Sequence, residues 1–217
     1  MRMKTKDLAL LSYLEKDFSD ATTSLHFSSP FECLVAILLS AQTTDKSVNA
    51  VTPALFSHFP TPERMAEASV EEIEQDIRRL GLYHAKAKNI LALSQKLVTD
   101  FGGGVPLEKK ILLSLPGVGN KTAGVFLLEQ GIEPYLPVDT HVHRIADRLG
   151  YSKEKDDPKK VEEKLEKTFP REKWVFLHHA LIWFGRKKRH ALKPECEDCP
   201  LQGYCSYFKK NLSKIGR

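Results

Sequence analysis

The sequence has little of what membrane proteins, disulfide-bonded proteins and sheets are built from. Its longest apolar run, Cys33 to Leu39, is far shorter than the ~20 residues that a membrane-spanning helix needs. Four of its 217 residues are cysteine, and alternation of apolar and polar residues is nearly absent. These shortages argue against a membrane span, a disulfide framework and a sheet. The content of 41% hydrophobic and 28% charged residues is that of a globular protein.

An export signal is also missing from the first stretch, MRMKTKDLALLSYLEKDF. Asp7, Glu15 and Asp17 interrupt its apolar residues, and no small-residue cleavage site follows. We therefore expect an amphipathic helix there and not a signal peptide. It follows that we expect a cytoplasmic protein in a reducing compartment, where thiols stay reduced.

The excess of positive charge lies near the C-terminus. The whole chain carries +5, and residues 183–217 hold nine Lys and Arg against three acidic residues, while the rest has 24 basic and 25 acidic residues. A solvated basic tail would explain this segment, but so would binding to a phosphate backbone. In the second case Lys187 and Lys193 are candidate contacts to nucleic acid.

Helical periodicity runs through nearly the whole chain, which predicts an all-α fold. In SSPFECLVAILLSAQ, Ser29 is placed as an N-cap, Pro30 as the first helical residue and Glu32 as the partner in a capping box. A second helix is expected to start near Thr44 and continue to about residue 59. The amphipathic stretch 69–81 is expected to end at Gly81 as its C-cap.

The most specific stretch is LLSLPGVGNKTAGVFLLEQG, in which Pro116, Gly117, Val118 and Gly119 form a sharp turn. A dinucleotide-binding fingerprint fails because position 122 is threonine, and a phosphate loop fails because Asn120 separates Gly119 from Lys121. A plain turn between helices and a DNA-binding helix-hairpin-helix both remain. In the second, glycines let backbone N–H groups approach a DNA phosphate.

The stretch VDTHVHRIADRLG places Asp139 before an apolar stripe, where N-capping alone would explain it. His141 and His143, and likewise His178 and His179, are most simply surface or packing residues. Cysteines cluster further on, with the spacing Cys196-x2-Cys199-x5-Cys205, while Cys33 is expected to be a small apolar core residue.

In combination, LPGVGNKTA, VDTH and the cysteine cluster resemble the endonuclease III family of helix-hairpin-helix DNA glycosylases. SPFECLVAILLSAQTTDKSVN, GLYHAKAKNI, VEEKLEKTFP and HHALIWFGR fit the same family in the same order. The resemblance implies two all-α lobes with a DNA-binding cleft between them. One is a central lobe with the helix-hairpin-helix at 21–132. The other joins 1–20 to 133–217 and carries the cysteine-cluster loop at 186–207.

The resemblance also implies a base-excision repair enzyme, nucleoid-associated and monomeric, whose partner is double-stranded DNA with damaged bases or abasic sites. It implies removal of oxidised pyrimidines, with Lys121 as the Schiff-base nucleophile, Asp139 as its acidic partner, and strand cleavage by β-elimination. Gln42 would fill the gap left by a flipped nucleotide, and Leu82 would wedge against the opposite strand. Lys86 and Lys88 are candidate phosphate contacts, or residues of a solvated helix face.

Two other functions remain open at this point. An adenine-removing glycosylase of the same superfamily uses the aspartate but lacks the lysine, so Lys121 argues against it. A DNA-binding module without catalysis would use the hairpin and the basic segment alone.

The resemblance implies a [4Fe–4S] cluster held by Cys-x6-Cys-x2-Cys-x5-Cys. Cys196, Cys199 and Cys205 match the last three positions, but Arg189 stands in the first and cannot ligate. We expect a cluster with incomplete cysteine ligation, for which His190 is the candidate fourth ligand. Zinc in a Cys3His site and a metal-free loop are the alternatives.

Overall fold

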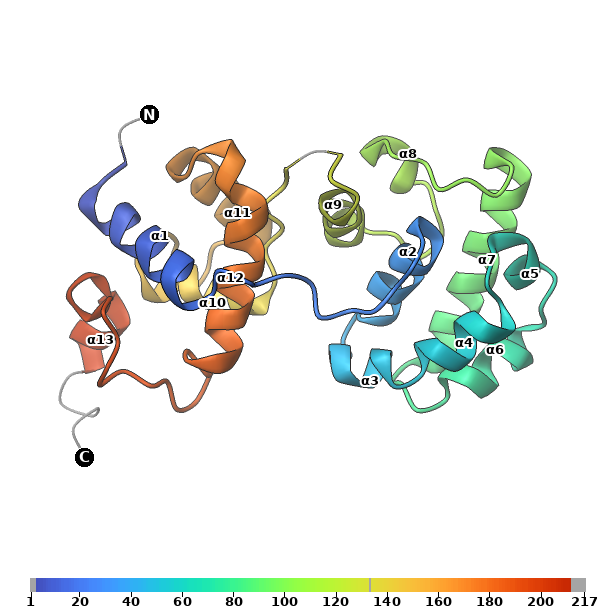
Figure 1. The fold of residues 1–217 in the computed structure, drawn as a ribbon, viewed down its shortest axis with the longest axis horizontal. Helices are drawn as coiled ribbons and strands as arrows, with labels where there is room; N and C mark the ends of the chain where they lie inside the picture. Colours follow the sequence, from blue (N-terminus) through green and yellow to red (C-terminus); the bar gives the residue numbers. More distant parts are fainter. Residues whose placement is uncertain (1–2, 133, 212–217) are drawn as a thin grey trace. The chain divides into compact units, whose positions relative to one another are not determined.

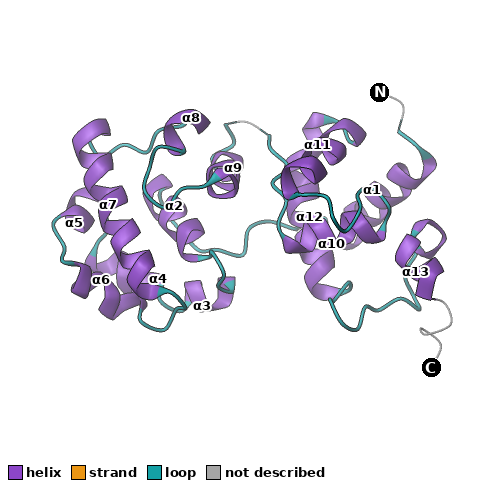
Figure 2. Cartoon of the chain, turned by 180° about the vertical axis from the view of Figure 1, so that it is seen from behind, coloured by secondary structure: helices purple, strands orange, loops and turns teal. Residues whose placement is uncertain are grey.

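The computed structural model describes residues 3–132 and 134–211, and within these ranges every regular element is a helix (Figures 1 and 2). Met1, Arg2, Glu133 and residues 212–217, including Lys214 and Arg217 of the basic segment, lie outside the described residues. The all-α prediction is therefore confirmed. No described helix is long and apolar enough to cross a membrane.

The helices follow one another in a fixed order along the chain. They are α1 Thr5–Asp17, α2 Pro30–Leu39, α3 Asp45–Asn49, α4 Thr52–His58, α5 Pro62–Ala66, α6 Val70–Ile77, α7 Tyr83–Phe101, α8 Lys109–Leu112, α9 Asn120–Glu129, α10 Thr140–Arg148, α11 Pro158–Thr168, the 3-10 turn η1 Arg171–Lys173, α12 Trp174–Lys187, the 3-10 turn η2 Gln202–Tyr204 and α13 Ser206–Asn211.

The chain divides into two compact units, each with its own core. Unit 1 combines Met1–Thr23 with Pro134–Arg217, and unit 2 is Ser24–Glu133. In unit 2 the long helix α7 packs against α5 and α6, and α2 packs against both α7 and α9. In unit 1, α12 packs against α1 and α10, and its core includes Leu14, Val142 and Leu177.

Local sequence signals account for most helix starts, with one correction. The side chain of Ser29 caps α2 by accepting from the Glu32 N–H, as expected. The Glu32 carboxylate does not complete the predicted capping box on Ser29. It accepts instead from the backbone N–H and hydroxyl of Ser28, both at 2.6 Å, because the chain before the cap bends toward it.

Two helix boundaries differ from the sequence expectation. The helix expected from Thr44 to about residue 59 is split into α3 and α4, because Pro53 has no N–H to continue the first helix and instead sits in the first turn of the second. Helix α6 ends at Ile77 and not at Gly81. The left-handed residue in this connection is Leu82, directly before α7.

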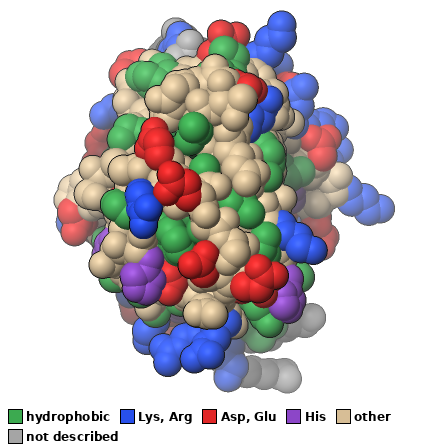
Figure 3. All heavy atoms as spheres, turned by 90° about the vertical axis from the view of Figure 1, so that its right-hand side faces the viewer, with side chains coloured by type: hydrophobic (Ala, Val, Ile, Leu, Met, Phe, Trp, Pro, Cys, Tyr) green, Lys and Arg blue, Asp and Glu red, His purple; other side chains and the backbone are tan. Residues whose placement is uncertain are grey.

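The charges of unit 2 are mixed on the face that lies at the right of Figure 1. Over most of this face, acidic, basic and apolar side chains are interspersed (Figure 3). Such mixing gives no field of one sign. The excess of positive charge therefore lies in residues 183–217, and this face of unit 2 does not share it.

Candidate functional site

The sharp turn predicted at Pro116–Gly119 joins the short helix α8 to α9. Gly117 has a φ of +75°, and an added Cβ would lie 3.0 Å from both Asn89 and Leu38, so this position requires glycine. Gly119 has an ordinary extended backbone, and nothing lies within 4 Å of where its Cβ would stand. Gly117 therefore serves the fold, whereas Gly119 keeps the outer side of the turn open.

Lys121 is the second residue of α9, just after the turn, and its side chain is exposed. Below it, Ala123, Phe126 and Leu127 bury the opposite face of the helix. This packing fixes the helix axis and leaves the lysine amine accessible from outside unit 2. An accessible amine at the start of a helix can be reached by a substrate from outside the unit.

Asp139 is the N-cap of α10 in unit 1, as its sequence context indicates. Its Oδ1 accepts hydrogen bonds from the N–H groups of His141 and Val142, both at 2.8 Å. Those bonds hold the carboxylate at the start of the helix, where the helix dipole favours a negative charge. The side chain is half-buried.

Gln42 and Leu82 share a backbone feature that the sequence did not reveal. They are the two non-glycine residues of the described chain with a positive φ, 54° and 59°. Both side chains are exposed, Leu82 at 61% of its surface. Such backbone geometry is costly and persists where the surrounding structure holds it.

Lys86 does not lie on an exposed face as a phosphate contact would. It is 5% exposed, and burial lowers the pKa of its ammonium group. Its Nζ donates to the hydroxyl of Thr43, which follows Gln42 in the chain. Lys88, by contrast, is exposed. Sequence reasoning missed Thr43 because nothing local to it indicates this contact.

The cysteine-cluster loop is held by arginines. Arg189, in the position of the missing cysteine, is 4% exposed, and its guanidinium donates to Cys196 Sγ at 3.1 Å and to the Glu195 carbonyl at 2.8 Å. From α10, Arg148 donates to the carbonyls of Arg189, His190 and Ala191 at 2.9–3.1 Å.

Arg144, four residues before Arg148 on the same helix face, donates to the carbonyls of Arg189 and Gly185, each at 3.1 Å. The helix that Asp139 caps is thereby tied to the loop. Arginines spaced i, i+4 on one helix were the sequence signal that could have revealed this connection.

The predicted metal ligands are not all brought together. His190 is half-exposed on its side chain, and its Nε2 lies 3.8 Å from Glu195 Oε1. Within residues 3–132 and 134–211, no three His, Cys, Asp or Glu side chains are grouped as metal ligands would be. His178 and His179 are buried and pack, as expected, and burial lowers the pKa of His179 to about 3.

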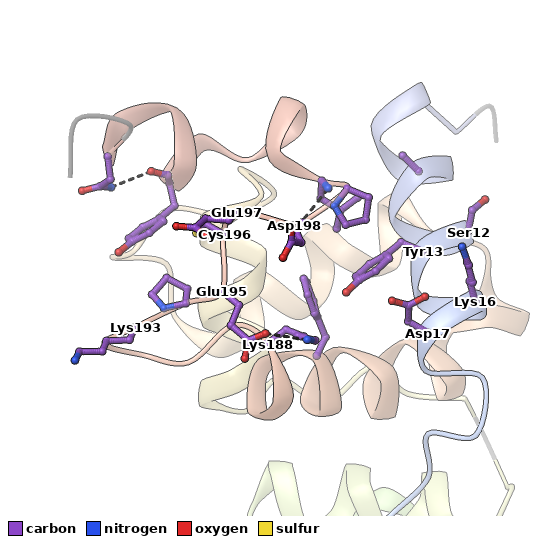
Figure 4. A pocket seen from close by; sticks show the side chains of 18 of the residues that line it. Ser12, Tyr13, Lys16, Asp17, Lys188, Lys193, Glu195, Cys196, Glu197 and Asp198 are labelled. Carbon is purple, nitrogen blue, oxygen red and sulfur yellow. Dashed lines mark hydrogen bonds and ion pairs between the residues drawn. The ribbon is translucent and has the colours of Figure 1, made fainter. Parts of the chain in front are cut away.

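A hollow of about 1210 Å³ lies between α1 and the cysteine-cluster loop. Tyr13 and Asp17 line it from α1, and Cys196, Glu197 and Asp198 line it from the loop (Figure 4). Cys196 itself is buried at the edge of this hollow. Lys193, which follows α12 in the chain, is exposed and also lines the hollow. Lys187, at the end of α12, has its Nζ 4.1 Å from the centre of the Trp183 ring.

Comparison with known proteins places these features in a family. Residues 35–171 match the HhH-GPD superfamily base excision DNA repair protein family, and residues 190–205 match the iron-sulfur binding domain of endonuclease III. Endonuclease III of Bacillus subtilis (strain 168) is 44% identical over 91% of this chain and 90% of that relative. Endonuclease III of Escherichia coli (strain K12) is 42% identical over 95% of this chain and 98% of that relative.

Two solved structures at 42% identity are similar over nearly the whole chain. One is a non-covalent endonuclease III–DNA complex, with a TM-score of 0.92 over 98% of this chain and 100% of that one. The other is a trapped endonuclease III–DNA covalent intermediate, with a TM-score of 0.91 over 97% of this chain and 100% of that one.

The match over residues 190–205 identifies an iron–sulfur binding domain and confirms the expected [4Fe–4S] cofactor. The sulfur environment suits it in part, because the N–H groups of Leu201 and Phe208 point at Cys199 Sγ and Cys205 Sγ at 3.4 Å. A ligand set of four thiolates does not fit, because the loop supplies three. Cys33 is fully buried in α2, where burial raises its pKa to about 12.

Proposed function

We propose that this chain, which belongs to the endonuclease III family of HhH-GPD base-excision DNA repair proteins, uses Lys121 as its nucleophile and Asp139 as its acidic partner. The resemblance expected from the sequence is confirmed by this relation. As a member of the family the chain is a DNA glycosylase that is also an AP lyase, and its partner is DNA.

The observation that carries the catalytic assignment is the placement of Lys121. An exposed amine follows directly on a turn whose outer side is open at Gly119. A relative at 42% identity has been trapped as a covalent intermediate with DNA, which supports nucleophilic chemistry in this chain as well. A DNA-binding module without catalysis would give that amine no chemical role.

In the proposed reaction the neutral Lys121 amine attacks C1′ of the damaged nucleotide. The bond from C1′ to the base nitrogen breaks, and the base leaves with that electron pair and takes up a proton. The amine then loses a proton, and the C1′–O4′ bond breaks with protonation of O4′, which opens the sugar ring and gives the Schiff base. The Schiff base makes a C2′ proton acidic, and loss of that proton expels the 3′ phosphate oxygen by β-elimination. The Asp139 carboxylate offsets the positive charge that develops on the sugar and relays protons.

DNA contacts are proposed for unit 2 at the open turn and at the two left-handed residues. The backbone N–H groups of Gly117 and Gly119 are proposed to bind a phosphate, because Pro116 has no N–H and that of Val118 donates to the Leu115 carbonyl. Gln42 is proposed to fill the space of the flipped nucleotide and Leu82 to separate the opposite base step. Lys187 and Lys193 are proposed as further phosphate contacts from unit 1.

Oxidised pyrimidines are the proposed substrates, in keeping with the family. We also propose that the protein works as a monomer in the cytoplasm, associated with the nucleoid, because its substrate is chromosomal DNA.

Borohydride trapping tests the catalytic assignment. Wild-type protein with duplex DNA containing an abasic site should give a covalent complex, and Lys121→Gln should reduce it by orders of magnitude while DNA binding persists. Lys110→Gln, which removes an exposed lysine of α8 in the same unit, is the matched control and should trap normally. A Lys121→Gln protein that traps at the wild-type rate would assign the nucleophile to another amine.

A further inference from the structure

We propose that Lys86 is a positioning residue that fixes the two DNA-inserting residues, Gln42 and Leu82, relative to each other through Thr43. The inference rests on the insertion roles proposed above. In this proposal Lys86 contacts Thr43 inside unit 2 and does not contact a DNA phosphate. Both left-handed residues and both residues of the link belong to that unit.

The first link runs from Lys86 to the loop that carries Gln42. The Lys86 Nζ donates to Thr43 Oγ1, and that hydroxyl in turn donates to the Ala41 carbonyl at 3.3 Å. The Thr43 N–H donates to the Ser40 carbonyl at 3.1 Å. The hydrogen-bonded groups therefore lie on both sides of Gln42 in the chain, and they hold a backbone conformation that L residues seldom adopt.

The second link runs from Lys86 to Leu82. Leu82 is the residue before α7, and the Lys86 N–H donates to its carbonyl at 3.0 Å as the first hydrogen bond of the helix. Lys86 thus bonds the Leu82 carbonyl through its backbone and the Gln42 loop through its side chain. One residue sets the spacing between the two insertion points.

Burial separates this role from that of a phosphate contact. Burying an ammonium group costs free energy, and the hydroxyl that accepts from Lys86 Nζ is neutral, so the contact is retained at a cost. Lys88, two residues further on the same helix, is exposed. A lysine selected for phosphate binding would resemble Lys88.

The consequence for catalysis is specific to paired DNA. Opening a base pair requires the plug and the wedge to enter the stack together, whereas a lesion that is already unpaired needs neither. Loss of the link should leave the chemistry intact and slow the extrusion step. A misplacement of about 1 Å in a positioning group is enough to slow a reaction about 100-fold.

The test compares excision of one lesion in two DNA contexts, paired in a duplex and unpaired in a bubble, under single-turnover conditions. Lys86→Met and Thr43→Val should each slow excision from the duplex about tenfold or more and change the bubble rate by less than about twofold. Thr43→Ser keeps the hydroxyl and should restore the duplex rate. The double variant should be no slower than either single one, because both remove the same link.

Lys96→Met is the matched control, since it removes a lysine from the same helix, α7, whose Nζ bonds Asp100 and not Thr43. Its duplex rate should stay close to that of the wild type. Equal slowing on duplex and bubble, or the same loss in Lys96→Met, would overturn the proposal. A fall in the salt dependence of DNA binding in Lys86→Met, with none in Thr43→Val, would return Lys86 to the phosphate contacts.

Two further arms keep the result interpretable. Thermal unfolding is measured for every variant, and if Lys86→Met does not fold, the pair Thr43→Val and Thr43→Ser carries the test alone. Wild-type excision on both substrates tests the proposed function separately. If the wild type excises the lesion from neither substrate, the proposed function fails. If the wild type is active and the variants slow excision equally on both substrates, only the role of Lys86 is refuted.

Discussion

The helix-hairpin-helix of unit 2 and the cysteine-cluster loop of unit 1 are both family motifs, but this chain treats them differently. The hairpin keeps every residue on which the resemblance rests, from Pro116 through Gly119 to Lys121. The loop has lost the first of its four cysteines to Arg189. Arg189 is nevertheless buried and bonded to Cys196.

The difference follows from what each motif must do. Covalent attack on a sugar needs an amine at one place, and no other side chain supplies it there. Holding a loop needs enough bonds between its ends, and a guanidinium with five N–H donors can contribute several of them. A motif that performs chemistry is therefore less replaceable than one that fastens the chain.

The largest expected effect is that of substituting Asp139, which is proposed to take part in the chemistry and also caps a helix. Asp139→Asn keeps an N-cap, since asparagine caps as well as aspartate, but it removes the negative charge. We expect turnover to fall about 100-fold or more while the free energy of unfolding changes by less than about 0.5 kcal/mol. Excision kinetics and denaturant unfolding check the two parts.

Asp139→Ala serves as the companion variant, because it loses both charge and cap. It should lose a comparable amount of turnover and in addition about 1 kcal/mol of stability. Full activity in Asp139→Asn would remove the carboxylate from the mechanism and leave Asp139 a structural residue.

The two glycines of the turn separate fold from DNA binding within the hairpin. Gly117→Ala places a Cβ at a φ of +75° and 3.0 Å from two side chains, so we expect a loss of at least about 1–2 kcal/mol in unfolding free energy. Gly119→Ala meets nothing within 4 Å and should cost less than about 1 kcal/mol, yet weaken DNA binding several-fold by standing where the phosphate approaches.

Thermal unfolding and DNA titration on the same preparations check this pair. If Gly119→Ala binds DNA as the wild type does, the open side of the turn is not the side that DNA contacts.

Helix positions and the N-cap at Asp139 could be predicted from the sequence because their causes are local. Ser29 and Asp139 accept hydrogen bonds from N–H groups within three residues, and Pro30 occupies the first helical position, where its missing N–H costs nothing. Gly102 ends α7 by its own left-handed conformation. The family, and with it Lys121, could be predicted because the order and spacing of several motifs are specific.

The contacts across the chain could not be predicted in this way. The backbone conformation of Leu82 is not suggested by its residue type, since the adjacent Gly81 would be the usual left-handed residue. Lys86 is predicted to be a surface residue by its charge, and its burial against Thr43 depends on a packing of residues 43 apart in sequence. The contact of Arg189 with Cys196 likewise depends on the loop's path.

The smallest expected effect concerns that contact and asks whether the cysteine-cluster loop can be returned to the family pattern. Arg189→Cys completes Cys-x6-Cys-x2-Cys-x5-Cys, so after anaerobic reconstitution we expect roughly four iron atoms per chain. They should resist a chelator for longer than those of the wild type, which supplies three thiolates. Before reconstitution the variant should unfold about 2–4 °C lower, because about 1 kcal/mol of Arg189 hydrogen bonding is lost.

Lys187→Cys is the control for this variant, because it adds a thiol at the wrong spacing and should gain no iron. Iron, sulfide and zinc analysis alongside thermal unfolding decides the outcome. If the wild type retains its cluster as firmly as Arg189→Cys does, a further group of this loop completes the ligand set, and the fastening role of Arg189 is secondary. If neither protein takes up iron, or both take up zinc, the arginine contacts have displaced the cluster from this chain.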